Sequence, residues 1–319
     1  MMRKLHRWAS VALSAAVMVS LTAGCSNPAD GGSGADASGK VALLLSTMNN
    51  PFFVSIRDGA QQEADNRGVS LNVLDAQNDP TTQANQVQTA VANKATAIII
   101  NPVDSDAAAA AIRPALDAKI PVVAVDRGIT GVTVDSFIAS DNVAGGKQAA
   151  DILAKAIGES GEVIVLEGIP GASSTRDRGQ GFTDRIKTYP KITVVASQTA
   201  NFDRTEGLDV TTNLMQANPG VVGIYAQNDE MALGAVAALG GNTAKAVKIV
   251  GFDGGDDALA DVKAGSMVAD IAQQPKLLGK QAVASISDIL AGKTVDKTQS
   301  MPVETVTQDT VDKFTQANS

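Results

Sequence analysis

The sequence predicts an α/β protein built from two doubly wound, Rossmann-like domains, each with a parallel sheet. From Lys40 onward, short runs of β-branched and aliphatic residues alternate with amphipathic, alanine-rich segments, and this alternation restarts at Val143. Continuous apolar strands that alternate with helices indicate parallel sheets covered on both faces. The length of 319 residues is too great for one ordinary core and suits two domains.

The first set of elements alternates strand and helix from residue 41 to residue 126. Apolar runs between turn-forming residues predict the strands, and the amphipathic stretches predict the helices. The expected elements are strand Val41–Thr47, helix Phe52–Arg67, strand Ser70–Asp75, helix Thr81–Asn93, strand Ala97–Asn101, helix Ser105–Ala118 and strand Val122–Asp126.

The second set repeats the same alternation from residue 143 to residue 253. It comprises helix Val143–Ile157, strand Glu162–Leu166, helix Ser174–Thr188, strand Thr193–Ser197, helix Thr205–Ala217, strand Val221–Ala226, helix Glu230–Leu239 and strand Lys248–Asp253. The two sets together predict two domains of the same kind.

Residues 1–24 predict a secretory signal peptide, with basic residues ahead of the apolar run Trp8–Leu21 and small residues at the expected cut site. A transmembrane anchor is the alternative, but this run is shorter than the ~20 residues that span a bilayer. The ending Leu-Thr-Ala-Gly-Cys resembles the lipobox of bacterial lipoproteins, in which the cysteine is acylated. We therefore expect an extracytoplasmic protein, anchored to the membrane through lipid on Cys25, with a flexible tether at residues 25–39.

Charge and rare residues exclude several functions. The net charge of −8 and the pI near 4.7 argue against a nucleic-acid partner. The only histidine and the only cysteine, His6 and Cys25, lie in the first 25 residues. The mature chain then has no histidine and no free thiol, which excludes Ser-His-Asp and Cys-His catalysis and histidine-ligated zinc. No Walker or dinucleotide glycine motif is present, so we expect no cofactor and no metal.

Polar and aromatic side chains gather where the predicted strands end. Ligands of such sheets bind at the carboxyl ends of the strands. Amides, carboxylates, guanidinium groups and phenyl rings suit an uncharged, polyhydroxylated ligand, with Asp126 and Asp253 as acceptors opposite Arg127 and Arg178. Taken singly, an Asp after a strand more often caps a helix or forms a turn. The convergence of many such groups on one edge favours a binding site.

Four segments are more specific: Ser46–Phe53 (STMNNPFF), Ile100–Asp106 (INPVDSD), Ala226–Gly234 (AQNDEMALG) and Val250–Gly254 (VGFDG). They closely resemble segments of the bacterial D-ribose-binding proteins, a family with the periplasmic-binding-protein type I fold. The resemblance runs from Lys40 to about Gly292, and the segment after Lys293 aligns loosely. It implies a three-segment hinge between a first lobe (residues 40–140 and 274–302) and a second lobe (residues 141–273 and 303–319).

The resemblance also implies a set of sugar contacts, with phenyl rings on both faces of the sugar and polar groups on its hydroxyls. These contacts fall on Asn50, Phe52, Phe53, Asn101, Asp126, Arg127, Arg178, Phe202, Asn228, Asp253 and Gln273. The implied function is capture of D-ribose by hinge closure and delivery to the transmembrane permease subunits of an ABC importer, with a chemoreceptor as a further partner.

Three other functions compete with D-ribose import. A sugar-responsive repressor shares the two-domain core but needs a helix-turn-helix ahead of residue 40, where the signal peptide and the tether lie. An enzyme could use Asp126 and Asp253 as acid and base, but we expect arginine and hydroxyl partners to keep both ionised. A binder of another sugar, such as allose, another pentose or a furanosyl signalling molecule, is the most serious alternative.

Overall fold

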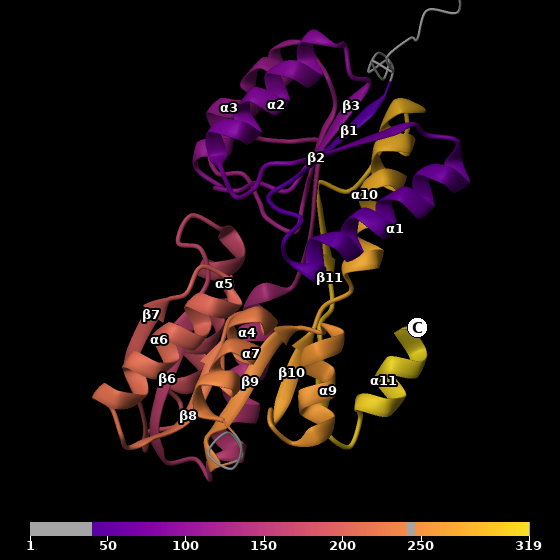
Figure 1. Ribbon diagram of the computed structural model, residues 1–319. Coiled ribbons are helices and arrows are strands. Elements are labelled where there is room, and N and C mark those ends of the chain that lie inside the picture. Colours follow the sequence, from indigo (N-terminus) through magenta and orange to yellow (C-terminus); the bar gives the residue numbers. More distant parts are fainter. Residues whose placement is uncertain (1–39, 241–245, 319) are drawn as a thin grey trace, which may run out of the picture. The chain divides into compact units, whose positions relative to one another are not determined.

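The computed structural model describes residues 40–240 and 246–318 of the chain (Figure 1). The predicted signal peptide, the predicted acylation site at Cys25 and the predicted tether lie outside these residues. Within them, no helix combines the length and the apolar character that crossing a membrane requires.

The first lobe is built on a six-stranded sheet in the order β11-β5-β4-β3-β1-β2. All of its strand pairs are parallel. The strands are β1 (Val41–Leu45), β2 (Leu71–Asp75), β3 (Ala97–Ile100), β4 (Val122–Val125), β5 (Ser136–Ser140) and β11 (Thr298–Met301). Its central strands are aliphatic and fully buried because helices cover both faces of the sheet.

The helices of the first lobe form two layers. Helices α1 (Pro51–Arg67) and α10 (Pro275–Leu290) pack on one face, in a core that includes Ile56 and Leu278. Helices α2 (Pro80–Ala92) and α3 (Ala107–Asp117) cover the other face. Helix α10 thus belongs to the first lobe although it follows most of the second lobe in sequence.

The second lobe is built on a six-stranded sheet in the order β12-β10-β9-β8-β6-β7, parallel except for the β10–β12 pair. The strands are β6 (Gly161–Glu167), β7 (Ile192–Thr199), β8 (Val221–Ala226), β9 (Lys248–Asp253), β10 (Ala269–Ala272) and β12 (Glu304–Thr307). Helices α4 (Asn142–Ala156) and α5 (Ser173–Ile186) cover one face. The other face is covered by α6 (Arg204–Ala217), α7 (Asp229–Leu239), α9 (Asp256–Ala264) and α11 (Val311–Asn318).

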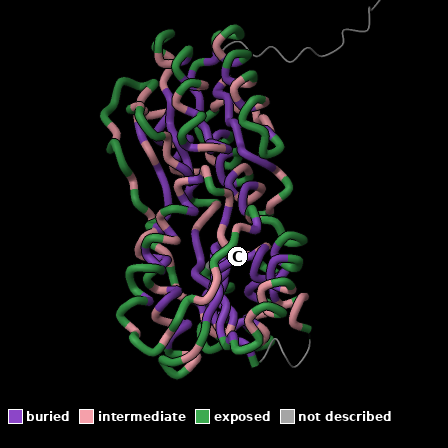
Figure 2. Tube along the Cα trace, turned by 90° about the vertical axis from the view of Figure 1, so that its left-hand side faces the viewer, coloured by how far each residue is buried: buried purple, intermediate pink, exposed green. Residues whose placement is uncertain are grey.

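Glycines allow one pair of helices to pack closely in each lobe. A Cβ on Gly59 of α1 would overlap the carbonyl group of Lys276 in α10. A Cβ on Gly146 of α4 would overlap the carbonyl oxygen of Arg178 and lie 2.8 Å from the backbone nitrogen of Phe182, both in α5. The buried residues form the interior of each lobe, and the exposed residues lie mainly on the outer turns and helix faces (Figure 2).

The chain passes between the two sheets three times: after β5, between β10 and β11, and between β11 and β12. Strand β5 and helix α9 were not expected from the sequence, and neither were β10 and β11. Strand β10 (ADIA) places an aspartate inside a four-residue strand, and β11 (TQSM) is almost entirely polar, so neither shows the apolar run that marks a buried strand.

Candidate functional site

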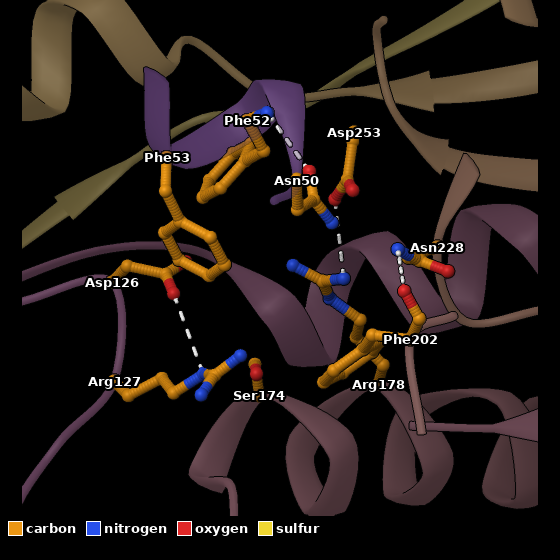
Figure 3. A pocket seen from close by; sticks show the side chains of 10 residues that line it. All are labelled: Asn50, Phe52, Phe53, Asp126, Arg127, Ser174, Arg178, Phe202, Asn228 and Asp253. Atoms are coloured by element: carbon orange, nitrogen blue, oxygen red, sulfur yellow. Dashed lines mark hydrogen bonds and ion pairs between the residues drawn. The ribbon is translucent and has the colours of Figure 1, made fainter. Parts of the chain in front are cut away.

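Ten side chains from both lobes surround one cavity at the carboxyl ends of the strands (Figure 3). The void among them is about 230 Å³, part of it open to solvent. The lining residues are Asn50, Phe52, Phe53, Asp126, Arg127, Ser174, Arg178, Phe202, Asn228 and Asp253. All except Ser174 are among the residues expected from the sequence. Asn101 and Gln273, also expected, do not line the cavity.

The first residues of α1 form the aromatic side of the first lobe's half of the site. Asn50 caps the helix, because its Oδ1 accepts a hydrogen bond from the backbone N–H of Phe52 at 2.8 Å. The rings of Phe52 and Phe53 meet edge to face, with centroids 5.3 Å apart. Both side chains also belong to the core of the first lobe, so they are rigidly held where they border the cavity.

Asp126 directly follows β4 and has a positive φ of 65°. A non-glycine residue in this left-handed region is uncommon, and such strain is concentrated at functional sites. Asn101, behind the cavity wall, donates from Nδ2 to Oδ2 of Asp126 at 3.0 Å. The other oxygen, Oδ1, is buried and has no hydrogen-bond partner among the described residues. Asp126 therefore keeps one acceptor for a ligand.

Arg127 is the buried cation of the first lobe, 2 % exposed. Its Nη1 donates to the carbonyl oxygen of Pro102 at 3.1 Å, and its Nε lies 3.7 Å from Oδ2 of Asp126. Its guanidinium carbon lies 5.3 Å from the ring centroid of Phe53 and 5.5 Å from that of Phe202. The guanidinium thus contacts rings from both lobes.

Arg178 of α5 holds the corresponding position in the second lobe. It donates from Nε to Oδ1 of Asn142 at 2.8 Å and from Nη1 to the carbonyl oxygen of Gln227 at 2.6 Å. Its guanidinium carbon lies 3.8 Å from the ring centroid of Phe252. These contacts fix the guanidinium plane at the cavity.

Asp253, the last residue of β9, is the acceptor that faces Arg178. Its Oδ1 accepts from Nη1 of Arg178 at 3.3 Å and from Nε2 of Gln273 at 2.7 Å. Gln273 therefore supports Asp253 from behind, as Asn101 supports Asp126. Asp253 also has a positive φ, of 134°.

The remaining second-lobe residues lie at the ends of β7 and β8. Phe202 has a φ of 60° and packs partly against the second lobe's core. Asn228 caps α7, because its Oδ1 accepts from the backbone N–H of Met231 at 3.0 Å. Its Nδ2 donates to the carbonyl oxygen of Phe202 at 3.4 Å. Asn50 and Asn228 therefore combine the capping role with a place in the cavity wall.

Ser174 is the lining residue that was not among the expected sugar contacts, although the helix-leading segment Ser174–Arg178 was expected on the same side of the sheet. It lies in the first turn of α5 and is 2 % exposed. The only signal available was its position in a helix start that follows a strand end, where a serine ordinarily indicates a cap.

Burial controls the charges of the cavity. It raises the pKa of Asp126, against the attraction of Arg127 and Arg178. It also raises the pKa of Asp253 to about 7, again against Arg178 and with a further upward contribution from Asp270. Burial therefore opposes the expectation that arginine and hydroxyl partners keep both carboxyls ionised, and it leaves the charge of Asp253 sensitive to pH near neutrality.

The two lobes also contact each other directly beside the cavity. The backbone N–H of Ser105 donates to the carbonyl oxygen of Gly171 at 3.0 Å, and that of Ser173 donates to Oγ of Ser105 at 3.1 Å. The N–H of Gly128 donates to Oγ of Ser173 at 2.9 Å. These bonds join the first lobe to the start of α5.

The arrangement is equipped for binding an uncharged polar ligand. Two carboxyl groups, two guanidinium groups and two amides supply acceptors and donors, and phenyl rings supply apolar contact. In the described part of the chain, no three side chains of the metal-ligating types converge. A larger void, about 910 Å³ including open solvent, lies between α5 and the edge strand β7, but only the second lobe lines it.

Two ribose import binding proteins are similar to this chain over most of its length. The ribose import binding protein RbsB of Bacillus subtilis (strain 168) is 44% identical over 268 residues, which are 84% of this chain and 87% of that protein. The ribose import binding protein RbsB of Escherichia coli (strain K12) is 48% identical over 255 residues, 80% of this chain and 86% of that protein.

A solved structure has the same fold. It is an ABC transporter periplasmic solute binding protein from Actinobacillus succinogenes 130z with bound D-allose, with a TM-score of 0.81 and 33% identity over 86% of this chain and 100% of that one. The named relatives are solute-binding proteins and not enzymes. Residues 41–294 match the periplasmic binding protein domain, and the fold is that of the solved structure with bound D-allose; the chain belongs to the periplasmic binding protein family.

Proposed function

We propose that this chain captures D-ribose outside the cytoplasm and delivers it to the permease of an ABC-type importer. The observation that carries the proposal is the composition of the cavity. Each lobe contributes a carboxyl group, an amide, a guanidinium group and at least one phenyl ring, and these groups face one void. The relatives named for ribose import, at 44% and 48% identity, support this ligand over the allose of the 33% identical structure.

The sugar is held by hydrogen bonds to its hydroxyls and by ring contacts to its C–H faces. Asp126 and Asp253 accept from hydroxyls, while Arg127, Arg178 and Asn228 donate to them. Hydrogen bonds to charged groups contribute roughly 1.5–3 kcal/mol each. Several of them, with the burial of the sugar against the phenyl rings, supply the roughly −8 kcal/mol that micromolar affinity requires after ordering costs.

Binding is coupled to closure of the lobes. The groups in each lobe form half of a site, so the sugar interacts fully only when the three chain crossings bring the halves together. A ligand that contacts one conformation more strongly shifts the population toward it. The closed form is the one that docks on the permease, and a chemoreceptor that reads the same form is a further partner.

Attachment to the membrane through an acylated Cys25 completes the proposal. The lipobox-like sequence that ends at this cysteine supports it. Replacing Cys25 with serine should release the protein from the membrane fraction into the medium or periplasm, and retention of the variant on membranes would contradict the anchor.

Isothermal titration calorimetry tests the ligand and the site together. Wild-type protein should bind D-ribose more tightly than D-allose, D-apiose or L-arabinose. Arg178→Ala and Asp253→Ala should each weaken D-ribose binding about tenfold or more, because each removes a charge-assisted hydrogen bond from the cavity. Arg204→Ala is the matched control, since Arg204 lies in the same lobe but pairs with Glu230 and Asp257 on the surface.

The outcomes separate the parts of the proposal. Near-wild-type affinity of both cavity variants, with unchanged folding, would contradict the site. Tight binding of another sugar without any binding of D-ribose would contradict the ligand and leave the site in place.

A further inference from the structure

Two buried carboxyl groups, of Asp229 and Asp270, lie behind the cavity wall and take no part in lining it. Asp229 is the first residue of α7 and directly follows Asn228. Asp270 lies in β10, paired with Gly251 of β9 two residues before Asp253. Asp229 is 4 % exposed and Asp270 is 0 % exposed. Both are therefore attached to elements that carry cavity residues.

The two carboxyl groups converge on one point. A Cβ built on Gly251 would lie 2.7 Å from Oδ1 of Asp229 and 2.9 Å from Oδ2 of Asp270. The other oxygen of Asp229 accepts from the backbone N–H of Gly255 at 2.7 Å. Among the described residues, Oδ1 of Asp229 and both oxygens of Asp270 have no hydrogen-bond partner of ordinary geometry, and the backbone N–H of Gly254 comes near enough to Asp270 only to oppose the rise of its pKa.

Two ionised carboxylates in this position would leave three buried oxygens poorly supplied with donors and place like charges against each other. Both effects are costly in a buried site. One proton removes the conflict, because the protonated carboxyl becomes a donor to its neighbour. Burial, and then the proximity of Asp270, raises the pKa of Asp229 well above its usual value, and burial raises the pKa of Asp270.

Other charged groups around the pair do not neutralise it. Arg178 acts on Asp270 from α5, but its hydrogen bonds go to Asn142, Gln227 and Asp253. Tyr225 of β8 is buried, and burial raises the pKa of its hydroxyl, so it remains neutral. The next residue of α7, Glu230, pairs with Arg204. The charged side chains of α9 and α11 nearest in the fold are exposed or half-buried: Asp256, Asp257, Asp261, Lys263, Asp312 and Lys313.

We propose that Asp229 and Asp270 share one proton beneath the cavity and act as positioning residues for Asp253. This inference rests on the proposed function, because its effect on binding is read through the sugar. The hydrogen bond from Gly255 to Asp229 ties the pair to the loop Asp253–Gly255, which carries the acceptor. When the shared proton is lost to solvent at high pH, a second negative charge pushes the carboxyls apart and displaces this loop. Sugar affinity then falls.

Asp270→Asn separates this role from ordinary structural support. An asparagine amide donates to Oδ1 of Asp229 as the shared proton would, but it cannot lose its proton. We expect the dissociation constant of wild-type protein for D-ribose to rise about threefold or more between pH 7 and pH 9, as the added like charge acts on Asp253. The variant should match wild type at pH 7 and change little up to pH 9. Asp229→Asn, the reciprocal variant, should behave in the same way.

Two readouts need no sugar. Infrared spectroscopy at about pH 6, where an ordinary aspartate is ionised, should show a protonated carboxyl C=O stretch in wild type that weakens in Asp270→Asn. The melting temperature of wild type should fall as pH rises, because a raised folded pKa stabilises the protein only while the proton is bound. Asp270→Asn should flatten this fall. Asp257→Asn, an exposed aspartate of the same lobe, is the control for the change in charge and should follow wild type.

Each result counts for or against the shared proton. Identical pH profiles of wild type and both asparagine variants would overturn it, as would an unchanged infrared band. If wild type binds no D-ribose at any pH, the proposed function fails, while the infrared and melting data still decide whether the proton is shared.

Discussion

At the residue scale, the site consists of two similar halves. In each lobe a carboxylate at a strand end is backed by an amide from the neighbouring strand: Asn101 behind Asp126, and Gln273 behind Asp253. The amide satisfies one carboxylate oxygen and fixes the orientation of the group. The resemblance assigned Asn101 and Gln273 to the sugar itself, and the structure places them as supports for the acids. Their contact with a sugar stays a prediction.

The raised pKa of Asp253 gives a testable pH dependence. Its value of about 7 means that the group loses its charge as the pH falls through neutrality. Because the ionised form accepts from Arg178 and from hydroxyls, D-ribose affinity should fall about tenfold per pH unit below this value. Calorimetric titrations from pH 5 to pH 8 check this. The control is Asp253→Asn, which should bind D-ribose more weakly than wild type but with an affinity that does not change over this pH range. A flat wild-type profile would contradict the assignment.

The same rise in the pKa of Asp253 affects stability in the opposite direction from sugar binding: as the pH rises, binding strengthens and stability falls. The folded pKa of Asp253 lies above the usual 3.8, so the folded state binds more protons than the unfolded state between these values. The free energy of unfolding contributed by this group is therefore lost as the pH rises from 3.8 to about 7. The protein gains binding strength over the same range in which this carboxyl costs it stability.

At the element scale, the parts of the fold that are predictable from the sequence are those with strong apolar patterns. Strands β3 (AIII) and β4 (VVAV) are buried on both faces, so their purely apolar composition indicates that they lie in the middle of a sheet. Strand β5 has only a short apolar core between serines, and β11 has none. Strands at the sheet edge or at the crossings between lobes form because their backbones pair with other strands in the folded protein. The identity of their residues does not indicate this pairing.

The candidate site was predictable to a similar extent and for a related reason. The strand ends bring residues such as Asp126 and Asp253 to one edge of their sheets whatever the details of packing. Ser174 was not predicted as a sugar contact because its position depends on how α5 approaches the cavity. The buried pair of Asp229 and Asp270 depends on the register of β9 with β10, which the sequence pattern does not contain.

The close contact of α4 with α5 gives a prediction for this scale. Gly146→Ala should lower the free energy of unfolding by about 1–3 kcal/mol or more, because the new methyl group overlaps the backbone of α5 and forces the helices apart. Chemical denaturation measures this. Lys155→Ala, an exposed change on the same helix, is the control and should have little effect. Equal free energies of unfolding for both variants would show that α4 and α5 can move apart without loss of stability.

At the scale of the whole molecule, the two lobes are joined by backbone crossings and by the hydrogen bonds of Ser105 and Ser173 beside the cavity. These bonds are formed by the protein itself and are available only when the lobes meet. They therefore contribute to closure independently of the sugar's own contacts.

Ser105→Ala tests this contribution. The variant loses the Oγ acceptor for the N–H of Ser173, so the closed form should be less favoured and the dissociation constant for D-ribose should rise about two- to tenfold. Calorimetry measures the change, and circular dichroism should show an unaltered fold. The control is Thr130→Ala in a neighbouring loop, because the Thr130 side chain makes no hydrogen bond to the second lobe among the described residues. Unchanged affinity of Ser105→Ala would mean that these bonds add nothing to closure.

The position of α10 has a consequence for how the chain assembles. The apolar face of α1, near the start of the described chain, is buried by Leu278 and Val283, more than 200 residues later. Contacts this distant in sequence are slow to form. During synthesis, the α1 side of the first lobe therefore stays uncovered until α10 has been made. Such a delay keeps the chain unfolded for longer, which is the condition that transport through a narrow membrane channel requires.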